Sequence, residues 1–275
     1  MSEVTDAPAR NEASARKPLQ GSHVWYELMT TDPDAAAEFY GAVVGWSISD
    51  SIPGEQDYRM IGRSDGGFAG GVFGLKPEQL SHGARPAWLG YVGVDDVDAT
   101  LALIEAKGGK ALMPAFDIPQ GRIAMVADPH GNPFYVMKPV PPVDKPGAES
   151  DVFASDAEQR VGWNELSTPD PVAARQFYGE VFGWGSDEFM DMGEYGEYRF
   201  FDHCSQRIGA VSGCVAGAQA GWRYYVRVPS IARATESVKA NGGSITMGPH
   251  EVPGGDHIII GKDPQGAEFA LVGKQ

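Results

Sequence analysis

The chain has 275 residues, 42% hydrophobic and 21% charged, and its 37 acidic against 22 basic residues give a formal net charge of −15. This length suffices for two domains that each bury a core. No segment is rich in Lys and Arg, which argues against a nucleic-acid partner. No apolar run approaches the roughly 18 residues of a membrane-spanning helix, so no membrane partner is expected either.

The acidity itself has two explanations. Solubility is the ordinary one, and attraction of cationic ligands is the alternative. Residues 1–21 are small and polar and lack the apolar core of a secretion signal, so they predict a disordered tail. Cys204 and Cys214 show no metal-binding spacing, and a reduced pair in a cytoplasmic protein is the expectation.

One long stretch of the sequence occurs twice. Trp25–Trp46, WYELMTTDPDAAAEFYGAVVGW, returns at an offset of 138 as Trp163–Trp184, WNELSTPDPVAARQFYGEVFGW, with 14 of 22 positions identical. Similarity over a whole supersecondary unit indicates duplication of a domain. Trp46 and Trp184, which close the two copies, are predicted to be core residues.

The first half reads as two units of one strand, one helix and three strands. A strand over 22–31 precedes Thr31-Asp32-Pro33, a helix start with a capping residue and a first-turn proline. The helix extends to about residue 44, and Gly45 ends it. The remaining elements are strands at 46–51, 57–63 and 68–73, then a strand at 87–94, a helix at 97–107 and strands at 110–113, 122–127 and 133–138.

The second half repeats this order at offsets of 134 to 138, which gives four β-α-β-β-β units and an α+β fold. We therefore expect a first domain at residues 22–138 and a second domain at residues 160–275. Residues 139–159 between them are rich in Pro and charge with little periodicity, which predicts a linker that is first semi-rigid and then flexible.

The motifs T-x-D-P, F-Y-G-x-V-x-G-W and D-P-x-G occur once in each half, in that order along the chain. In this combination the chain resembles the vicinal oxygen chelate superfamily of glyoxalases, bleomycin-resistance proteins and extradiol dioxygenases. It is similar to the two-domain branch described only as glyoxalase-like. The resemblance implies that each pair of units curls a half-open sheet around a cavity.

The resemblance also implies where a divalent metal would be held, by His, Glu or Gln on four strands. The matching positions are occupied by Trp25, Leu89 and Tyr135 in the first domain and by Trp163, Arg223 and Ala270 in the second. The fourth falls at 71–73 and 210–212, where no carboxylate or imidazole occurs. Indole and aliphatic groups do not coordinate metals, and an arginine repels them. The sequence therefore predicts neither a metal site nor another cofactor.

Alternation along strands identifies which side chains share a face with these positions. Glu27 and Glu165 follow Trp25 and Trp163 by two residues, and buried carboxyls among aromatics suit acid–base chemistry. Catalytic candidates are Glu27, Tyr91, Tyr135 and Glu165. Ligand-binding candidates are Trp25, Leu89, Trp163, Arg223, Tyr225 and Glu268.

Structural explanations compete with these roles. Each Glu could be held by a neighbouring strand or Tyr, and Trp25 and Trp163 could plug the cavity or stack on a flat ligand. The favoured function is metal-independent binding or sequestration of a hydrophobic or cationic natural product. A cofactorless isomerase, lyase or cyclase is the alternative, and a metal-dependent glyoxalase or dioxygenase is disfavoured. Since four units in one chain can complete a cavity internally, a monomer or a homodimer is expected.

Overall fold

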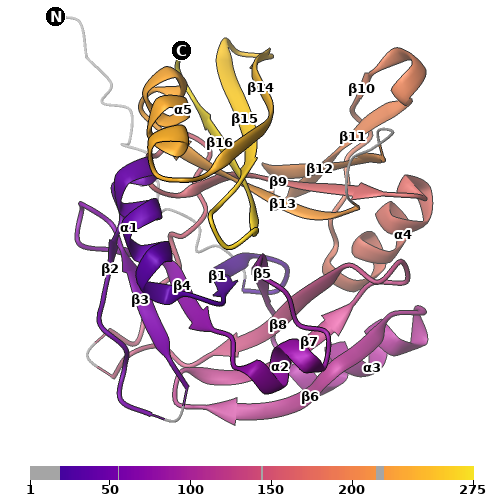
Figure 1. The fold of residues 1–275 in the computed structure, drawn as a ribbon. Helices are drawn as coiled ribbons and strands as arrows, with labels where there is room; N and C mark the ends of the chain where they lie inside the picture. Colours follow the sequence, from indigo (N-terminus) through magenta and orange to yellow (C-terminus); the bar gives the residue numbers. More distant parts are fainter. Residues whose placement is uncertain (1–18, 55, 144, 215–219) are drawn as a thin grey trace, which may run out of the picture.

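Two mixed sheets of eight strands each, one from each half of the chain, form the protein in the computed structural model (Figure 1). The structure describes residues 19–54, 56–143, 145–214 and 220–275. The strand orders are β2-β3-β4-β1-β5-β8-β7-β6 and β10-β11-β12-β9-β13-β16-β15-β14, so the second sheet repeats the first strand for strand. The predicted tandem α+β architecture is confirmed.

The first half contains the two predicted strand–helix–strand units and one further short helix, α2. Its elements are β1 (His23–Thr30), α1 (Pro33–Val44), β2 (Ser47–Ile48), β3 (Tyr58–Gly62), β4 (Phe68–Gly74), α2 (Pro77–Ser81), β5 (Ala87–Gly93), α3 (Val97–Ala106), β6 (Lys110–Ile118), β7 (Gly121–Ala127) and β8 (Pro133–Pro139).

The second half repeats the order with a single turn of 3₁₀ helix, η1, between β10 and β11. Its elements are β9 (Val161–Thr168), α4 (Pro171–Phe182), β10 (Phe189–Asp191), η1 (Gly193–Tyr195), β11 (Glu197–His203), β12 (Gln206–Gly213), β13 (Gly221–Val228), α5 (Ile231–Ala240), β14 (Ser244–Val252), β15 (Asp256–Lys262) and β16 (Glu268–Gly273).

Local chemistry accounts for the ends of α1 and α4. The side chains of Asp32 and Asp170 accept hydrogen bonds from the backbone N–H groups three residues later, and a proline opens each helix. Gly45 and Gly183 end the helices with φ of 82° and 74°, a left-handed conformation that glycine adopts at little cost. The repeated motif therefore encodes one helix twice.

The first strand of each half lies at the centre of its sheet. β1 pairs in parallel with β4 and antiparallel with β5, and this register places Glu27 between Gly71 and Leu89. β9 pairs in the same way with β12 and β13, which places Glu165 between Ala210 and Arg223. We call the face of each sheet that carries these glutamates its site face.

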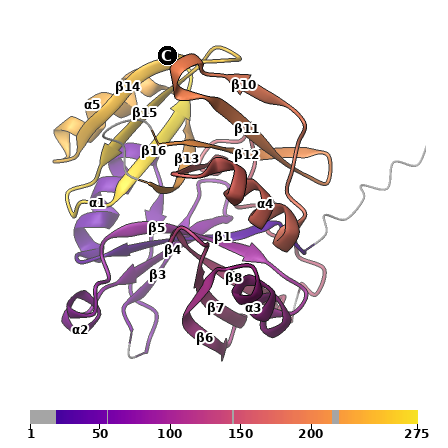
Figure 2. The same ribbon diagram turned by 90° about the vertical axis from the view of Figure 1, so that its right-hand side faces the viewer.

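The opposite faces of the two sheets, together with the helices, pack against each other in one continuous core. In Figures 1 and 2, α1 lies beside α5 and α4 lies near α3, so each helix of a repeated motif reaches the other half. Tyr40 Oη donates to Asp263 Oδ2 at 3.0 Å, and the equivalent Tyr178 Oη donates to Asp128 Oδ2 at 3.1 Å. Both site faces consequently point away from the contact between the halves.

Trp46 and Trp184 are buried in this core, as predicted. Within the predicted linker, Val152 and Phe153 are buried as well. Phe153 forms a parallel bridge with Val161, which ties the segment to the start of β9.

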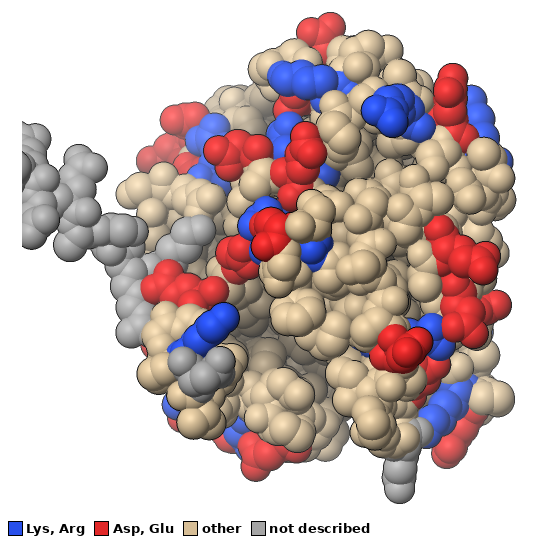
Figure 3. Space-filling view, turned by 90° about the vertical axis from the view of Figure 1, so that its left-hand side faces the viewer, with Lys and Arg blue, Asp and Glu red and all other residues tan. Residues whose placement is uncertain are grey.

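The predicted disordered tail lies mostly outside the described residues. Its last residues are ordered: the Gly21 N–H donates to the Gly93 carbonyl at 2.8 Å, and Gln20 Nε2 donates to the Val181 carbonyl at 3.3 Å. Within the described chain, no helix combines the length and apolar character needed to cross a bilayer. On the face drawn in Figure 3, Asp and Glu side chains are interspersed with Lys and Arg.

Candidate functional site

The site face of the first domain is built around Glu27. Its side chain is only 2% exposed, and Tyr91 Oη donates to its Oε2 at 2.9 Å. The other carboxyl oxygen, Oε1, accepts no hydrogen bond from any described residue. An acid buried with so few partners is unusual, since buried polar groups are normally satisfied.

Burial raises the pKa of Glu27 to about 7, against the opposing effect of its phenol neighbours Tyr91 and Tyr58. No Lys, Arg or His in the described chain forms an ion pair with it. Without a nearby cation, desolvation controls the charge of the group. Near neutral pH this carboxyl can therefore either give up or accept a proton.

Aromatic side chains surround the acid. Trp25 Nε1 donates to Tyr58 Oη at 2.9 Å. The rings of Tyr91 and Tyr135 stack with centroids 4.2 Å apart and planes 12° from parallel. Burial raises the pKa of both phenols, so they stay protonated and can serve as hydrogen-bond donors.

Tyr58 was missed by the sequence analysis, which read its segment only as a strand. The signal was present, because Asp57-Tyr58-Arg59 in the first half matches Glu197-Tyr198-Arg199 in the second. A tyrosine that occurs at the same place in both halves indicates a site residue more strongly than the strand propensity of its segment does. The predicted residues Trp25, Glu27, Leu89, Tyr91 and Tyr135 do lie on one face.

These side chains are packed against one another rather than around an open space. Leu89, Tyr91 and Tyr135 are all buried, in a cluster covered by half-buried residues. Methionine is frequent here, with five of the chain's nine on the site face: Met29, Met60, Met113 and Met125 are half-buried and Met137 is buried. Their counterparts in the second domain are Ser167, Phe200, Met247, Ile260 and Val272. Unbranched thioether side chains can repack around a ligand.

In the second domain the equivalent acid, Glu165, is fully hydrogen-bonded and paired with a cation. Glu165 accepts from Tyr198 Oη at 2.7 Å, from Tyr225 Oη at 3.1 Å and from Arg223 Nη1 at 2.8 Å. Arg223 also forms an ion pair with Glu268 at 2.8 Å. Trp163 Nε1 donates to Tyr198 Oη at 2.8 Å, as Trp25 does to Tyr58. All five predicted residues of the second domain thus belong to one connected network.

Neither site face fits a metal ion. The positions that hold ligands in metal-binding relatives carry an indole, an aliphatic group and a phenol in the first domain, and an indole, a guanidinium and a methyl group in the second. Among the described residues, no group of three or more His, Cys, Asp or Glu is arranged to hold one. Indole and aliphatic groups do not coordinate metals, a guanidinium repels them, and the phenol of Tyr135 is kept protonated by burial, so these positions do not supply the ligands that divalent metals require.

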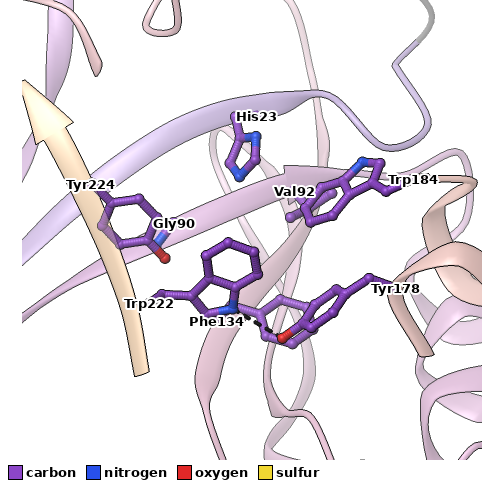
Figure 4. Close-up of a pocket in the computed structure, with 8 residues that line it drawn as sticks. All are labelled: His23, Gly90, Val92, Phe134, Tyr178, Trp184, Trp222 and Tyr224. Atoms are coloured by element: carbon purple, nitrogen blue, oxygen red, sulfur yellow. Dashed lines mark hydrogen bonds between the residues drawn. The ribbon is translucent and has the colours of Figure 1, made fainter. Parts of the chain in front are cut away.

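A small cavity lies elsewhere, between the two halves (Figure 4). His23 and Trp184 line it, and Trp222 Nε1 donates to Tyr178 Oη across it at 2.9 Å. Its free volume of about 10 Å³ is at the lower limit for one water molecule. Burial lowers the pKa of His23 to about 3, so the imidazole is neutral there. This cavity is too small for an organic ligand.

A shallow hollow of about 400 Å³ lies over α4, between Val172 and Gly185. Its lining comes from α4 and from Trp184 and Gly185, which follow it, and includes none of the predicted site residues. The predicted site residues lie instead on the two site faces.

A family model described as the Glyoxalase/Bleomycin resistance protein/Dioxygenase superfamily matches residues 22–136 and 160–271. The chain belongs to this superfamily. The "Anthracycline biosynthesis protein DauV" of Streptomyces sp. (strain C5) is 31% identical over 267 residues, covering 92% of this chain and 93% of that protein. The "Putative glyoxylase CFP32" of Mycobacterium tuberculosis is 29% identical over 261 residues, covering 92% and 95%.

Solved structures of superfamily enzymes share the fold. The Mn(II)-bound glyoxalase from Novosphingobium aromaticivorans superposes with a TM-score of 0.62 at 18% identity, covering 93% of this chain and 83% of that one. The 2,2',3-trihydroxybiphenyl 1,2-dioxygenase from Sphingomonas wittichii RW1 gives 0.63 at 15% identity, covering 92% and 90%. At such identities the likeness concerns the fold alone.

Taken by its chemistry, the first site can donate or accept one proton and can accept hydrogen bonds at a buried carboxyl. The second site has its carboxylates already paired with an internal cation, and such a network mainly positions its own members. The two copies of one framework therefore differ in what they can offer to a ligand.

Proposed function

We propose that the first domain binds a small, largely apolar organic molecule at Glu27, without a metal ion. One contrast carries this proposal: Glu165 accepts three hydrogen bonds, one of them from a guanidinium, whereas Glu27 accepts one. A buried acceptor that lacks partners is destabilising by about 1–3 kcal/mol. A ligand that brings a donor to Glu27 recovers this energy.

The cover of the site supports the same function. Methionine side chains are adaptable, and surfaces rich in them accommodate ligands by repacking. The half-buried Trp25, Met29 and Met125 reach solvent while Glu27 below them is shielded. A ligand would displace the thioether side chains and stack against the aromatic rings. These rings offer a large apolar surface for contact with a ligand.

The relatives indicate a class of molecule. DauV and the "Anthracycline biosynthesis protein DnrV" of Streptomyces peucetius carry names that connect them with flat polycyclic natural products. DnrV matches 44% of this chain at 33% identity. We infer a planar, ring-containing ligand of natural-product type for this chain, bound by a monomer or homodimer. The exposed free thiols of Cys204 and Cys214 suit a cytoplasmic location.

A second candidate function is a cofactorless isomerase, lyase or cyclase. The observation that favours it is the pKa of Glu27, which burial raises to about 7, next to the protonated phenol of Tyr91. A general base is most effective when its pKa lies near the working pH. Glu27 would take a proton next to a ligand carbonyl, and Tyr91 would donate a hydrogen bond to the oxygen that becomes negative.

Titration with flat tricyclic aromatic probes, in the presence of EDTA, tests the binding function. We expect at least one probe to bind at one site per chain with a Kd of about 10 µM or lower. Met60→Trp should block this site, because Met60 lies opposite Gly71 beside Glu27. Phe200→Trp, the matched change in the second domain, should leave binding intact.

Two results would overturn the proposal: binding that EDTA abolishes, or binding that Phe200→Trp blocks and Met60→Trp does not. For the second candidate, a bound ketone probe should exchange its α-hydrogen for deuterium in D₂O in the wild type and not in Glu27→Gln. Exchange that persists in Glu27→Gln removes Glu27 as the base.

A further inference from the structure

The two copies of the domain differ in the side chain that lies beside the acid. Arg223 lies on β13 directly across from Glu165, and Leu89 lies on β5 directly across from Glu27. Both glutamates share the neighbouring tyrosine, Tyr225 or Tyr91, as a hydrogen-bond donor. The two sites thus differ at the position directly across from the glutamate, where the second domain carries a guanidinium and the first an aliphatic side chain.

The Arg223 side chain takes the place beside Glu165 that a bound cationic ligand would take, although it is part of the chain. Its guanidinium is buried, with the side chain 8% exposed, and donates from Nη1 to Glu165 and from Nε and Nη2 to Glu268. The position matching Glu268 in the first domain is Pro133, which brings no second carboxylate. A group that replaces Arg223 in the first domain therefore needs one cationic donor and otherwise an apolar body.

The surroundings of Glu27 favour a cation over a neutral donor. The titratable groups that face it are Tyr58 from β3, Tyr91 from β5 and Tyr135 from β8, while Leu89 and Gly71 on its two sides carry no charge. Aromatic ring faces attract organic cations, and more strongly when water is excluded. The chain also carries a net charge of −15, which steers cations towards it.

We propose that the ligand of the first domain is an organic cation, whose protonated nitrogen takes opposite Glu27 the place that the Arg223 guanidinium takes opposite Glu165. This inference rests on the proposed binding function and narrows its ligand to a flat amine, amidine or guanidine. It also makes residue 89 the residue that determines specificity. Leucine at this position leaves Glu27 available to a ligand, whereas an arginine would form an ion pair with Glu27 and occupy the position of the ligand.

Three tricyclic probes of similar size test the charge of the ligand: aminoacridine as the cation, anthracenemethanol as the neutral donor and anthracenecarboxylate as the anion. We expect the cation to bind at least about tenfold more tightly than the other two, a factor that corresponds to one charged hydrogen bond. Glu27→Gln should remove this preference and leave the affinity for anthracenemethanol within about threefold of the wild type.

The affinity for aminoacridine should depend on pH in one direction. Because the cation binds the ionised acid, affinity should rise about tenfold per pH unit below the pKa of Glu27, which burial raises to about 7, and level off above it. Leu89→Arg should abolish binding of aminoacridine by supplying the cation internally. Val172→Arg, which adds the same charge at an exposed position on α4 outside the site, should retain it, and circular dichroism verifies that both variants fold.

The outcomes separate this inference from the function on which it rests. If all three probes bind with equal affinity and Met60→Trp blocks them, the first domain binds small molecules and the inference of a cationic ligand is overturned. If Leu89→Arg folds and still binds aminoacridine as the wild type does, the role of residue 89 is overturned. If no probe binds, the binding function and the inference both fail.

Discussion

Tyr26 and Asn164 are joined by a buried hydrogen bond of 2.7 Å, from Tyr26 Oη to Asn164 Oδ1. Each residue precedes the glutamate of its own domain, so Glu27 and Glu165 lie on opposite sides of two strands that meet back to back. A second buried bond, from the Gly90 N–H to Tyr224 Oη at 2.8 Å, joins the strands that carry Leu89 and Arg223. The two sites thus share one hydrogen-bonded framework and differ in the side chains that surround the two glutamates.

Glu27→Gln should change how stability depends on pH. The pKa of Glu27 rises from 4.5 to about 7 on folding, so between these values the folded state binds more protons than the unfolded state. Stability from this group is therefore complete below about pH 4.5 and is lost as pH rises towards 7, by about 3 kcal/mol in all.

Urea denaturation of the wild type and Glu27→Gln from about pH 4.5 to about pH 7.5 measures this effect. The wild type should lose about 3 kcal/mol relative to the variant across the range. His23, whose pKa burial lowers to about 3, contributes with the opposite sign, and it is present in both proteins. Parallel profiles for the two proteins would show that Glu27 ionises normally.

Arg223→Leu, which copies the first domain into the second, should destabilise the protein. It leaves Glu165 and Glu268 close together and without their cation, and breaking such a partly buried ion pair costs about 2–4 kcal/mol. Arg122→Ala is the control, because that ion pair with Asp98 is exposed and weakened by solvent screening. Equal urea midpoints for Arg223→Leu and the wild type would contradict the account of the second site.

Gly71→Ala should move Tyr58. A Cβ at Gly71 would lie 2.1 Å from Tyr58 Oη, so the phenol ring has to move away from residue 71. Ala210 occupies the matching position in the second domain, where Tyr198 donates to Glu165. We expect the displaced Tyr58 to donate to Glu27 in the same way and to strengthen the lowering effect that it already has on the pKa of this acid.

The carboxyl ¹³C chemical shift of Glu27 reports this change directly. Ala210→Gly is the matched control in the second domain and should not affect Glu27. A Gly71→Ala protein that folds and titrates at Glu27 as the wild type does would show that Tyr58 has no influence on the acid.

Tyr40→Phe and Tyr178→Phe should weaken the contact between the halves by similar amounts. Tyr40 Oη donates to Asp263 and accepts from Trp88 Nε1 at 2.9 Å, and Tyr178 bridges its own pair in the same manner. Loss of the hydroxyl leaves two buried groups unsatisfied, a cost of about 1–3 kcal/mol in each variant. Exposed Tyr195→Phe serves as control, and unfolding free energies that match it would contradict the symmetry of the contact.

The sequence sufficed for the architecture because duplication and capping motifs are local signals. Asp32-Pro33 and Gly45 set the ends of α1 within the segment that contains them. The short helix α2 was not predicted, because it spans only five residues and begins after Lys76, which is not a typical capping residue. The burial of Val152 and Phe153 depends on partners distant in sequence, and their neighbours are polar.

The members of the site could also be identified from strand alternation, but not their electrostatic states. Leu89 and Arg223 stood out as the differing pair, yet their effect depends on being directly opposite Glu27 and Glu165. The partners Tyr58 and Tyr198 come from strands whose register the sequence does not show. Burial and hydrogen-bond number, which distinguish the two acids, are properties of the folded chain.

The pKa of Glu27 is the measurement that tests the central claim most directly, by titrating the ¹³C-labelled glutamates with Glu27→Gln used to assign the signal. An uncompensated, buried acid in the first domain predicts a titration midpoint near 7. A midpoint at the ordinary glutamate value of about 4.3 would contradict it, because the carboxyl would then be either solvated or already paired.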